Sequence, residues 1–245
     1  MVAFQPQPTK AVGRRLDERV NMATNKELAE QEILRGFIEF VNRQVGVYCD
    51  CLGGFEGNRV RTERQVAIVN HPTHRRWENG TPVIVWNSVE DPTRPDIIHN
   101  RTVRADEYIS LNSEAGFNEQ QICWSIIVFM FTYWDEVVRP EIARVRGVQP
   151  NDIRIEAFGD LRIMRKAIVH NKGVVTQVKH MELKVLAKLC EPGVKIAPTH
   201  EQMHSLFVAI KKAIAGLLLE YSGHLPGAPS ADEIVDVAIQ RVPRK

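Results

Sequence analysis

The feature that most constrains the fold is an apolar segment from Asn118 to about Val145. Within it, one set of apolar side chains recurs at three- and four-residue steps, and a second set covers much of the remaining helical surface. The first set is Ile122, Ile126, Phe129, Tyr133 and Val137, and the second is Trp124, Ile127, Phe131, Trp134 and Val138. A helix that is apolar around most of its circumference must be covered on most sides. The segment therefore predicts a central helix surrounded by other helices.

Three further segments show helical periodicity and recognisable ends. The first covers about 25–45, and the glycines that follow it close the element; these are Gly53, Gly54 and Gly57. The second begins near Asn151 or Asp152, either of which can cap a helix, and ends at Gly173, which suits the left-handed position after a helix. The third follows a capping box at Thr199–Gln202 and covers Met203 to about Tyr221. Together with the central segment, these predict a four-helix bundle.

The segment from about Arg59 to Tyr108 has a different pattern. Its runs QVAIV and TPVIVWNSV are short and rich in β-branched residues, and Asn79-Gly80 and Asp91-Pro92 are turn signals. We therefore expect a mainly α fold with a β-rich insertion of hairpins at about 59–108, between the first and second core helices.

Length and composition favour one globular domain. The chain has 245 residues, of which 44% are hydrophobic and 25% charged, as in ordinary globular proteins. We expect a single domain over 14–225, a mobile tail over 1–13 with Pro6 and Pro8, and a C-terminal tail over 226–245.

Charge, cysteine content and hydropathy limit the possible binding partners and the cellular compartment of the protein. The formal net charge is only +2, so any nucleic-acid binding must come from a local patch. The four cysteines are irregularly spaced, which argues against a secreted disulfide scaffold and favours the cytoplasm. The apolar run 122–134 is interrupted by Ser125 and Thr132 and is shorter than a membrane span requires, so we expect no membrane association.

Arg165 breaks the apolar pattern of the third helical segment. With about 100° per residue, one stripe collects the apolar residues and Arg165 falls in its middle; the apolar residues are Ala157, Phe158, Leu161, Met164, Ile168 and Val169. A buried charge without a partner costs several kcal/mol. Either Arg165 forms a structural ion pair, for instance with Asp135 or Glu136, or it forms an anion site, because a guanidinium matches the geometry of phosphate.

His170 follows Arg165 by five residues, in the last turn before Gly173, and Asn171 comes next. A helix C-terminus favours the imidazolium form and leaves the ring at the end of the element. A fixed cation and a titratable ring beside one apolar groove are the parts needed for acid/base chemistry on a phosphodiester.

The segment FGDLRIMRKAIVHNKG resembles the signature of HEPN domains (higher eukaryotes and prokaryotes nucleotide-binding). These are compact helical bundles with an R-x4-6-H motif, and Arg165 to His170 fits the R-x4-H form. The pair Ile168-Val169 before the histidine and Asn171 after it also resemble many members. The position after the arginine is often Asn or Asp in the family and is Lys166 here.

The resemblance implies a metal-independent endoribonuclease without a cofactor, in bacterial defence or a toxin-antitoxin system. It implies a homodimer in which the motifs of two copies share a cleft, and it leaves room for an antitoxin or defence-complex partner. His170 would transfer the proton at a ribose 2′-OH or the leaving 5′-oxygen, and Arg165 would hold the phosphate, with Lys166, Asn171 and Arg162 in support. Dependence on the 2′-OH would restrict cleavage to RNA. The alternative is a catalytically inactive HEPN-like interaction or nucleotide-sensing module, which Lys166 keeps open.

A second group of cations lies in the expected insertion. It consists of Arg59, Arg61, Arg64, Arg75 and Arg76, with Trp77 beside them. A solvated surface is the ordinary interpretation. The functional one is an arm that contacts RNA or a partner protein, with Trp77 or Trp86 available to stack on a base.

Cys49, Cys51, His71 and His74 are candidate zinc ligands by residue type. Their C-x-C and H-x2-H spacings are tighter than those of ordinary structural zinc sites. The pattern favours cysteines packed under a glycine-rich loop, and we predict no metal site.

Overall fold

The computed structural model describes residues 10–71, 84–91 and 93–222. The chain is mainly helical, as predicted. The elements in order are α1 (Lys10–Val69), β1 (Ile84–Asp91), β2 (Arg94–Arg104), α2 (Ala105–Leu111), α3 (Phe117–Tyr133), the π-helical η2 (Trp134–Val138), α4 (Arg139–Arg146), the 3-10 helix η3 (Pro150–Asp152), α5 (Glu156–His170), α6 (Gln177–His180), the 3-10 helix η4 (Ala187–Leu189) and α7 (His200–Ser222).

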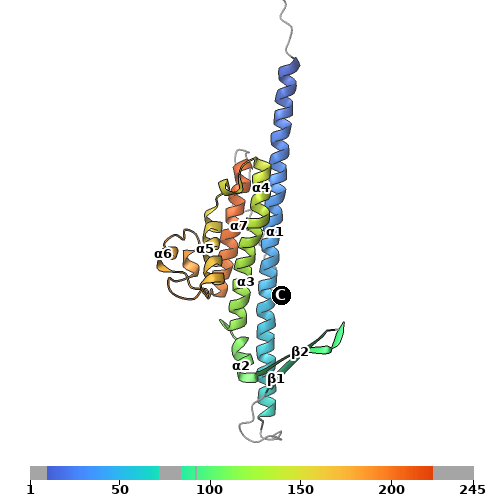
Figure 1. Cartoon of the computed structure of the whole chain (residues 1–245), viewed down its shortest axis with the longest axis vertical. Coiled ribbons are helices and arrows are strands. Elements are labelled where there is room, and N and C mark those ends of the chain that lie inside the picture. The colour runs from blue at the N-terminus through green and yellow to red at the C-terminus, as the bar shows by residue number, and fades with distance from the viewer. Residues whose placement is uncertain (1–9, 72–83, 92, 223–245) are drawn as a thin grey trace, which may run out of the picture.

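Four of the helices, α1, α3, α5 and α7, form the bundle (Figure 1). Helix α3 packs between α1 and α5, and α7 contacts both α1 and α5. The capping box in front of α7 is confirmed, because the Thr199 hydroxyl accepts from the Gln202 N–H and the Gln202 side chain accepts from the Thr199 N–H. The N-terminal part of α1 continues beyond the other helices.

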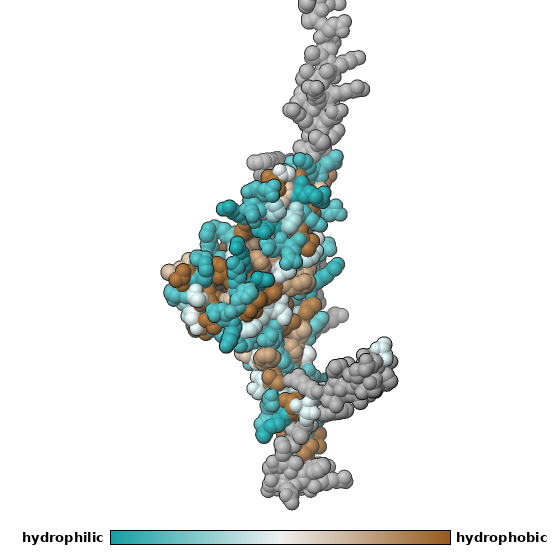
Figure 2. Space-filling view, in the orientation of Figure 1, coloured by the Kyte–Doolittle hydropathy of each residue, from teal (hydrophilic) through white to brown (hydrophobic). Residues whose placement is uncertain are grey.

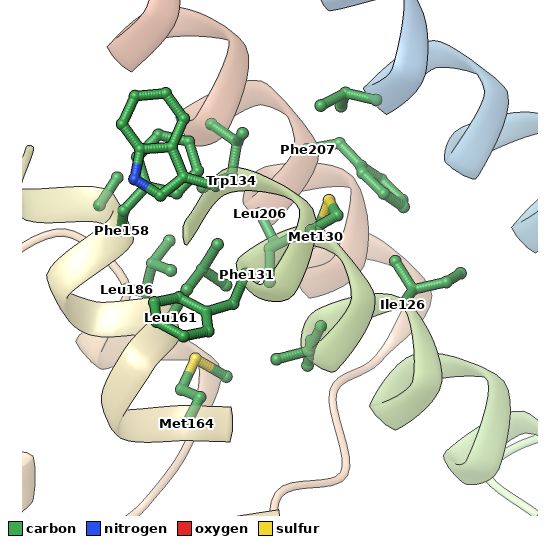
Figure 3. Packing of buried hydrophobic residues seen from close by; sticks show 14 of the residues in the cluster. Ile126, Met130, Phe131, Trp134, Phe158, Leu161, Met164, Leu186, Leu206 and Phe207 are labelled. Atoms are coloured by element: carbon green, nitrogen blue, oxygen red, sulfur yellow. The ribbon is translucent and has the colours of Figure 1, made fainter. Parts of the chain in front are cut away.

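The core lies between these helices and contains stacked aromatic rings (Figure 3). The Trp134 and Phe158 rings stack with their centroids 3.9 Å apart, and Phe37 from α1 approaches Phe158 at 5.6 Å. The apolar pattern of α3 is confirmed in part, since Ile126, Ile127 and Met130 are buried. One side of α3 nevertheless faces solvent, with Phe129 50% exposed.

Helix α1 is much longer than its sequence pattern indicates. We expected Gly53, Gly54 and Gly57 to end it, but the helix runs from Lys10 through these glycines to Val69. All three are exposed, and a Cβ at any of them would have open space around it. The helix continues there because its C-terminal part packs against α2 and buries Thr62. Of the expected N-terminal tail, 10–13 is therefore helical and 1–9 lies outside the described residues.

The β-rich insertion expected at about 59–108 is not supported. Residues 59–69 belong to α1 and 105–111 form α2. Between them, the described chain has a single antiparallel hairpin, in which β1 and β2 pair from Ile84↔Arg104 to Glu90↔Ile98 and then lose register. Asn79-Gly80, which we expected to form a turn, and the expected tail at 226–245 lie outside the described residues.

No helix in the described part of the chain has both the length and the apolar composition to cross a membrane. Hydrophilic residues cover much of the visible surface of the bundle, with apolar patches between them (Figure 2).

Candidate active site

Helix α5 presents a different face to the core than the sequence pattern predicts. It begins at Glu156 rather than at Asn151 or Asp152, which belong to η3. Its buried residues are Ala157, Phe158, Asp160, Leu161, Met164 and Ala167, whereas Val169 is 50% exposed. The centre of the buried face is therefore near Leu161. Arg165, expected in the middle of the apolar stripe, lies at its edge and is half-buried.

The Arg165 guanidinium has no acidic partner among the described residues. Its Nε is buried and has no hydrogen-bond partner. The ion pair considered with Asp135 does not form, because Asp135 binds Arg139 at 2.6 Å instead, and Glu136 is exposed to solvent. A guanidinium that is partly withdrawn from water and not neutralised by a carboxylate favours binding of an anion.

His170 is the last residue of α5 and is exposed at the start of a well-ordered turn. Gly173 has φ +84, the left-handed conformation predicted for it, and its N–H donates to the Ala167 carbonyl at 2.9 Å. The Asn171 side chain donates to the Val174 carbonyl at 2.5 Å, and the Val174 N–H returns a bond to the Asn171 carbonyl at 2.9 Å. Asn171 therefore closes the turn behind His170.

The same turn is held from outside by Trp124 of α3. The Trp124 ring packs directly on Gly173, where any Cβ would overlap the indole. Its Nε1–H donates to the Ile196 carbonyl at 2.8 Å, and the Ile196 N–H donates to the Gly173 carbonyl at 2.8 Å. Lys195 covers the indole face, with its Nζ 4.7 Å from the ring centroid. The sequence pattern counts Trp124 only among the apolar residues around the central helix. Nothing local in the sequence reveals its contact with Gly173.

Asp160 anchors the segment that follows α6. Its carboxylate is buried and accepts the backbone N–H groups of Lys184 at 3.0 Å, Val185 at 2.6 Å and Leu186 at 2.8 Å. No role was predicted for Asp160 from the sequence, so this one was missed. An acidic residue directly beside a buried leucine was the one available signal.

Arg165 and His170 do not converge within one copy of the chain. Five residues on a helix separate two side chains by about 140° around the axis and about 7.5 Å along it. Lys166 and His170, four residues apart, lie on one face, and both are exposed. The structure therefore gives the candidate site two separate parts, a half-buried cation and an exposed ring at the helix end.

An open groove of about 1150 Å³ runs beside α5. Three of the supporting residues predicted from sequence line it, namely Arg162, Lys166 and Asn171, whereas Arg165 and His170 are not among its lining residues. The groove therefore adjoins the candidate site rather than containing it.

The other predicted cations lie at the far end of α1. Arg61 and Arg64 are exposed on this helix and not on a hairpin. Arg59 is held by Glu56 and Glu63, each at 2.7 Å, which offsets its charge. Arg75, Arg76 and Trp77 lie outside the described residues.

The candidate zinc ligands are spread along a straight helix. Cys49 and Cys51 lie within α1, with no glycine-rich loop over them, and His71 follows the end of the helix. A helix of 20 residues spans about 30 Å, so Cys51 and His71 cannot share an ion. Within the described ranges no three His, Cys, Asp or Glu side chains are placed to hold a metal, and His74 lies outside those ranges.

The end of α5 can supply a fixed positive charge from Arg165 and a proton-transferring ring from His170.

Comparisons of the chain with models of protein families, with curated proteins and with solved structures find no match.

Proposed function

We propose that the protein is a metal-independent RNA endonuclease in which Arg165 binds the reacting phosphate and His170 transfers the proton. The observation that carries the proposal is the Arg165 guanidinium, which is half-buried, has an unpaired Nε and has no carboxylate partner in the described chain. Keeping such a cation costs folding free energy unless it meets an anion. The resemblance of the segment from Arg165 to His170 to the HEPN motif supports a phosphodiester as that anion.

The reaction follows from the two groups. His170 takes the proton of a ribose 2′-OH, the 2′-oxygen attacks the neighbouring phosphorus, and the bond from phosphorus to the 5′-oxygen breaks. The leaving 5′-oxygen takes a proton from water, and His170 then returns its own proton to water, so the products are a 2′,3′-cyclic phosphate and a 5′-hydroxyl. Arg165 stabilises the negative charge that develops on the phosphoryl oxygens. DNA lacks the attacking hydroxyl and is not cleaved.

The proposed site is shared by two copies of the chain. Because Arg165 and His170 lie about 140° apart on α5, one copy presents them to different directions, and a second copy brings another arginine and histidine to the same cleft. Val169 on α5 is 50% exposed and next to His170, which makes it a suitable contact residue. We expect a dimer at micromolar concentration by sedimentation, and a shift to monomer in Val169→Asp. If a strict monomer cleaves RNA, the proposal of a cleft shared by two copies is wrong, and the proposed roles of Arg165 and His170 in the reaction are unaffected.

The resemblance to HEPN domains supports extending the proposal to the cellular setting. We propose a role in bacterial defence or a toxin-antitoxin stress response in the cytoplasm. An antitoxin or another protein of a defence complex is then the candidate partner that controls the nuclease.

The decisive experiment compares Arg165→Ala and His170→Ala with Arg144→Ala and His204→Ala. Both control residues are exposed on other helices. We expect loss of RNA cleavage, in the presence of a metal chelator, only in the first pair, with thermal unfolding unchanged within a few degrees. A 2′,3′-cyclic phosphate at the product end identifies the mechanism. Wild-type activity in purified His170→Ala would refute the nuclease.

A catalytically inactive module that binds nucleotides or a partner is the second candidate. The separation of Arg165 and His170 around α5 favours it, because one copy lacks a converged acid/base site. RNA binding that depends on Arg165, without cleavage under any condition in which the protein dimerises, would support this candidate.

A further inference from the structure

The groove beside α5 is lined by more cationic side chains than its carboxylates can neutralise. Six line it: Arg139, Arg154, Arg162, Lys166, Lys179 and Lys184. The four carboxylates that also line it are all engaged. Asp135 binds Arg139 and Glu156 binds Lys184, both at 2.6 Å, Glu182 binds Lys179 at 2.7 Å, and Asp160 accepts backbone N–H groups. Within the described chain, this leaves three lining cations without an acidic partner, namely Arg154, Arg162 and Lys166.

Two of these three are placed at a regular step along α5. Arg162 and Lys166 are exposed and four residues apart, and His170 follows after another four residues. Each step advances about 6 Å along the helix and about 40° around it. This advance is comparable with the separation of successive phosphates in an extended single strand. The series therefore describes a path along one side of α5 that ends at the proposed catalytic ring.

The groove also has an apolar component between its cations. Ile155, Ile163 and Val174 contribute to its lining. A nucleotide strand presents charged phosphates and apolar faces of bases and riboses in alternation, whereas an acidic peptide segment presents chiefly carboxylates. The mixture favours the nucleotide strand.

We propose that this groove binds a single-stranded RNA segment that flanks the cleaved bond, with Arg162 and Lys166 each contacting a phosphate. The inference rests on the proposed nuclease function and extends it by assigning where the substrate strand lies. It predicts that RNA affinity depends on the outer face of α5, away from Arg165.

The experiment measures binding of a fluorescent oligouridine to the full chain by anisotropy, in a His170→Ala background that prevents cleavage. It compares Arg162→Ala/Lys166→Ala with Arg35→Ala/Arg144→Ala, which removes the same charge from exposed residues that do not line the groove. Loss of two phosphate contacts lowers the salt slope by about 1.4 and weakens affinity about 25-fold at 0.1 M salt. We expect these changes only in the groove variant, and a higher KM when His170 is restored.

The outcomes separate the groove from the nuclease. If the wild type cleaves RNA and the groove variant has unchanged affinity, KM and salt slope, the proposed RNA-binding role of the groove is wrong and the proposed nuclease function stands. Groove-dependent binding without any cleavage would overturn the nuclease and support the groove as an RNA site. Displacement of the oligouridine by polyglutamate as readily as by unlabelled polyuridine, at equal charge, would overturn the RNA assignment in favour of an acidic protein segment.

Discussion

The C-terminal ends of α1 and α5 have similar residues and different surroundings. Helix α1 is followed by Asn70 and His71, whose N–H groups donate to carbonyl groups of the preceding turn. Helix α5 ends at His170 and is followed by Asn171, and the turn after it is fixed by residues more than 20 positions away in the sequence. The nearby cations differ as well, because Arg59 is neutralised by two glutamates, whereas Arg165 has no carboxylate partner within the described chain.

The comparison shows that residue type alone does not make a candidate site. Catalytic groups must be held close to one geometry, and long-range packing supplies that restraint. At the end of α5, the restraint comes from Trp124, which packs on Gly173 and bonds to the strand-like segment at Ile196.

The largest expected effect comes from replacing Gly173 with alanine. The new Cβ would overlap the Trp124 ring, and φ +84 disfavours any L side chain, so we expect a loss of about 3 kcal/mol in unfolding free energy. Gly193 is the matched control, since it has φ +77 and open space around a Cβ. We expect Gly193→Ala to cost about 1 kcal/mol. Urea unfolding measures both; equal losses would mean that the contact with Trp124 does not restrain the turn.

The next effect comes from Asp160→Asn, which tests the support behind α5. Replacing the carboxylate removes charge-assisted bonds to three N–H groups and directs an amide donor toward some of them, at a cost of about 2 kcal/mol. Asp152→Asn is the control, because its exposed carboxylate accepts only the Gln149 N–H. We expect that control to change stability by less than about 0.5 kcal/mol. Similar losses in chemical denaturation would contradict a special role for Asp160.

Local patterns were sufficient to predict the bundle but not all its boundaries. The periodicity of α3 and the capping box of α7 act over a few residues, so the sequence contains the whole signal. The end of α1 depends on a balance between weak helix formers and packing. Gly53, Gly54 and Gly57 each cost about 1 kcal/mol in a helix, and contacts with α2, which no local pattern contains, offset that cost.

The candidate site divides in the same way. The left-handed Gly173 and the positions of Arg165 and His170 near the end of a helix follow from local sequence. The burial of Arg165 does not, because the helical wheel gives the apolar arc and not the neighbours that cover it. Trp124 and Asp160 act on segments 49 and 24 residues away, and such contacts appear only once the helices are packed.

A smaller effect is expected from Trp124→Phe, which keeps an aromatic ring on Gly173 and removes the indole N–H. The lost bond to the Ile196 carbonyl costs about 1 kcal/mol. We also expect a fall in kcat with KM unchanged, because the strand-like segment at Ile196 no longer fixes the turn that carries His170. Tyr133→Phe, on the same helix, is the control. If kcat falls equally in both variants, Trp124 has no positioning role.

The smallest effect is expected at the end of α1, from Arg61→Ala/Arg64→Ala. Both side chains are exposed on a straight helix, so they contact RNA only if the strand extends well beyond α5. We expect affinity at 0.1 M salt to fall by about fivefold at most, which corresponds to one lost phosphate contact and a slope change of about 0.7. Turnover at saturating RNA should match that of Arg35→Ala/Arg144→Ala. An unchanged slope would leave this surface to a protein partner, because exposed cations that bind RNA must release counterions. A collapse of turnover with affinity intact would reverse the comparison, since the reacting groups would then lie near the end of α1 and the turn at Gly173 would be structural.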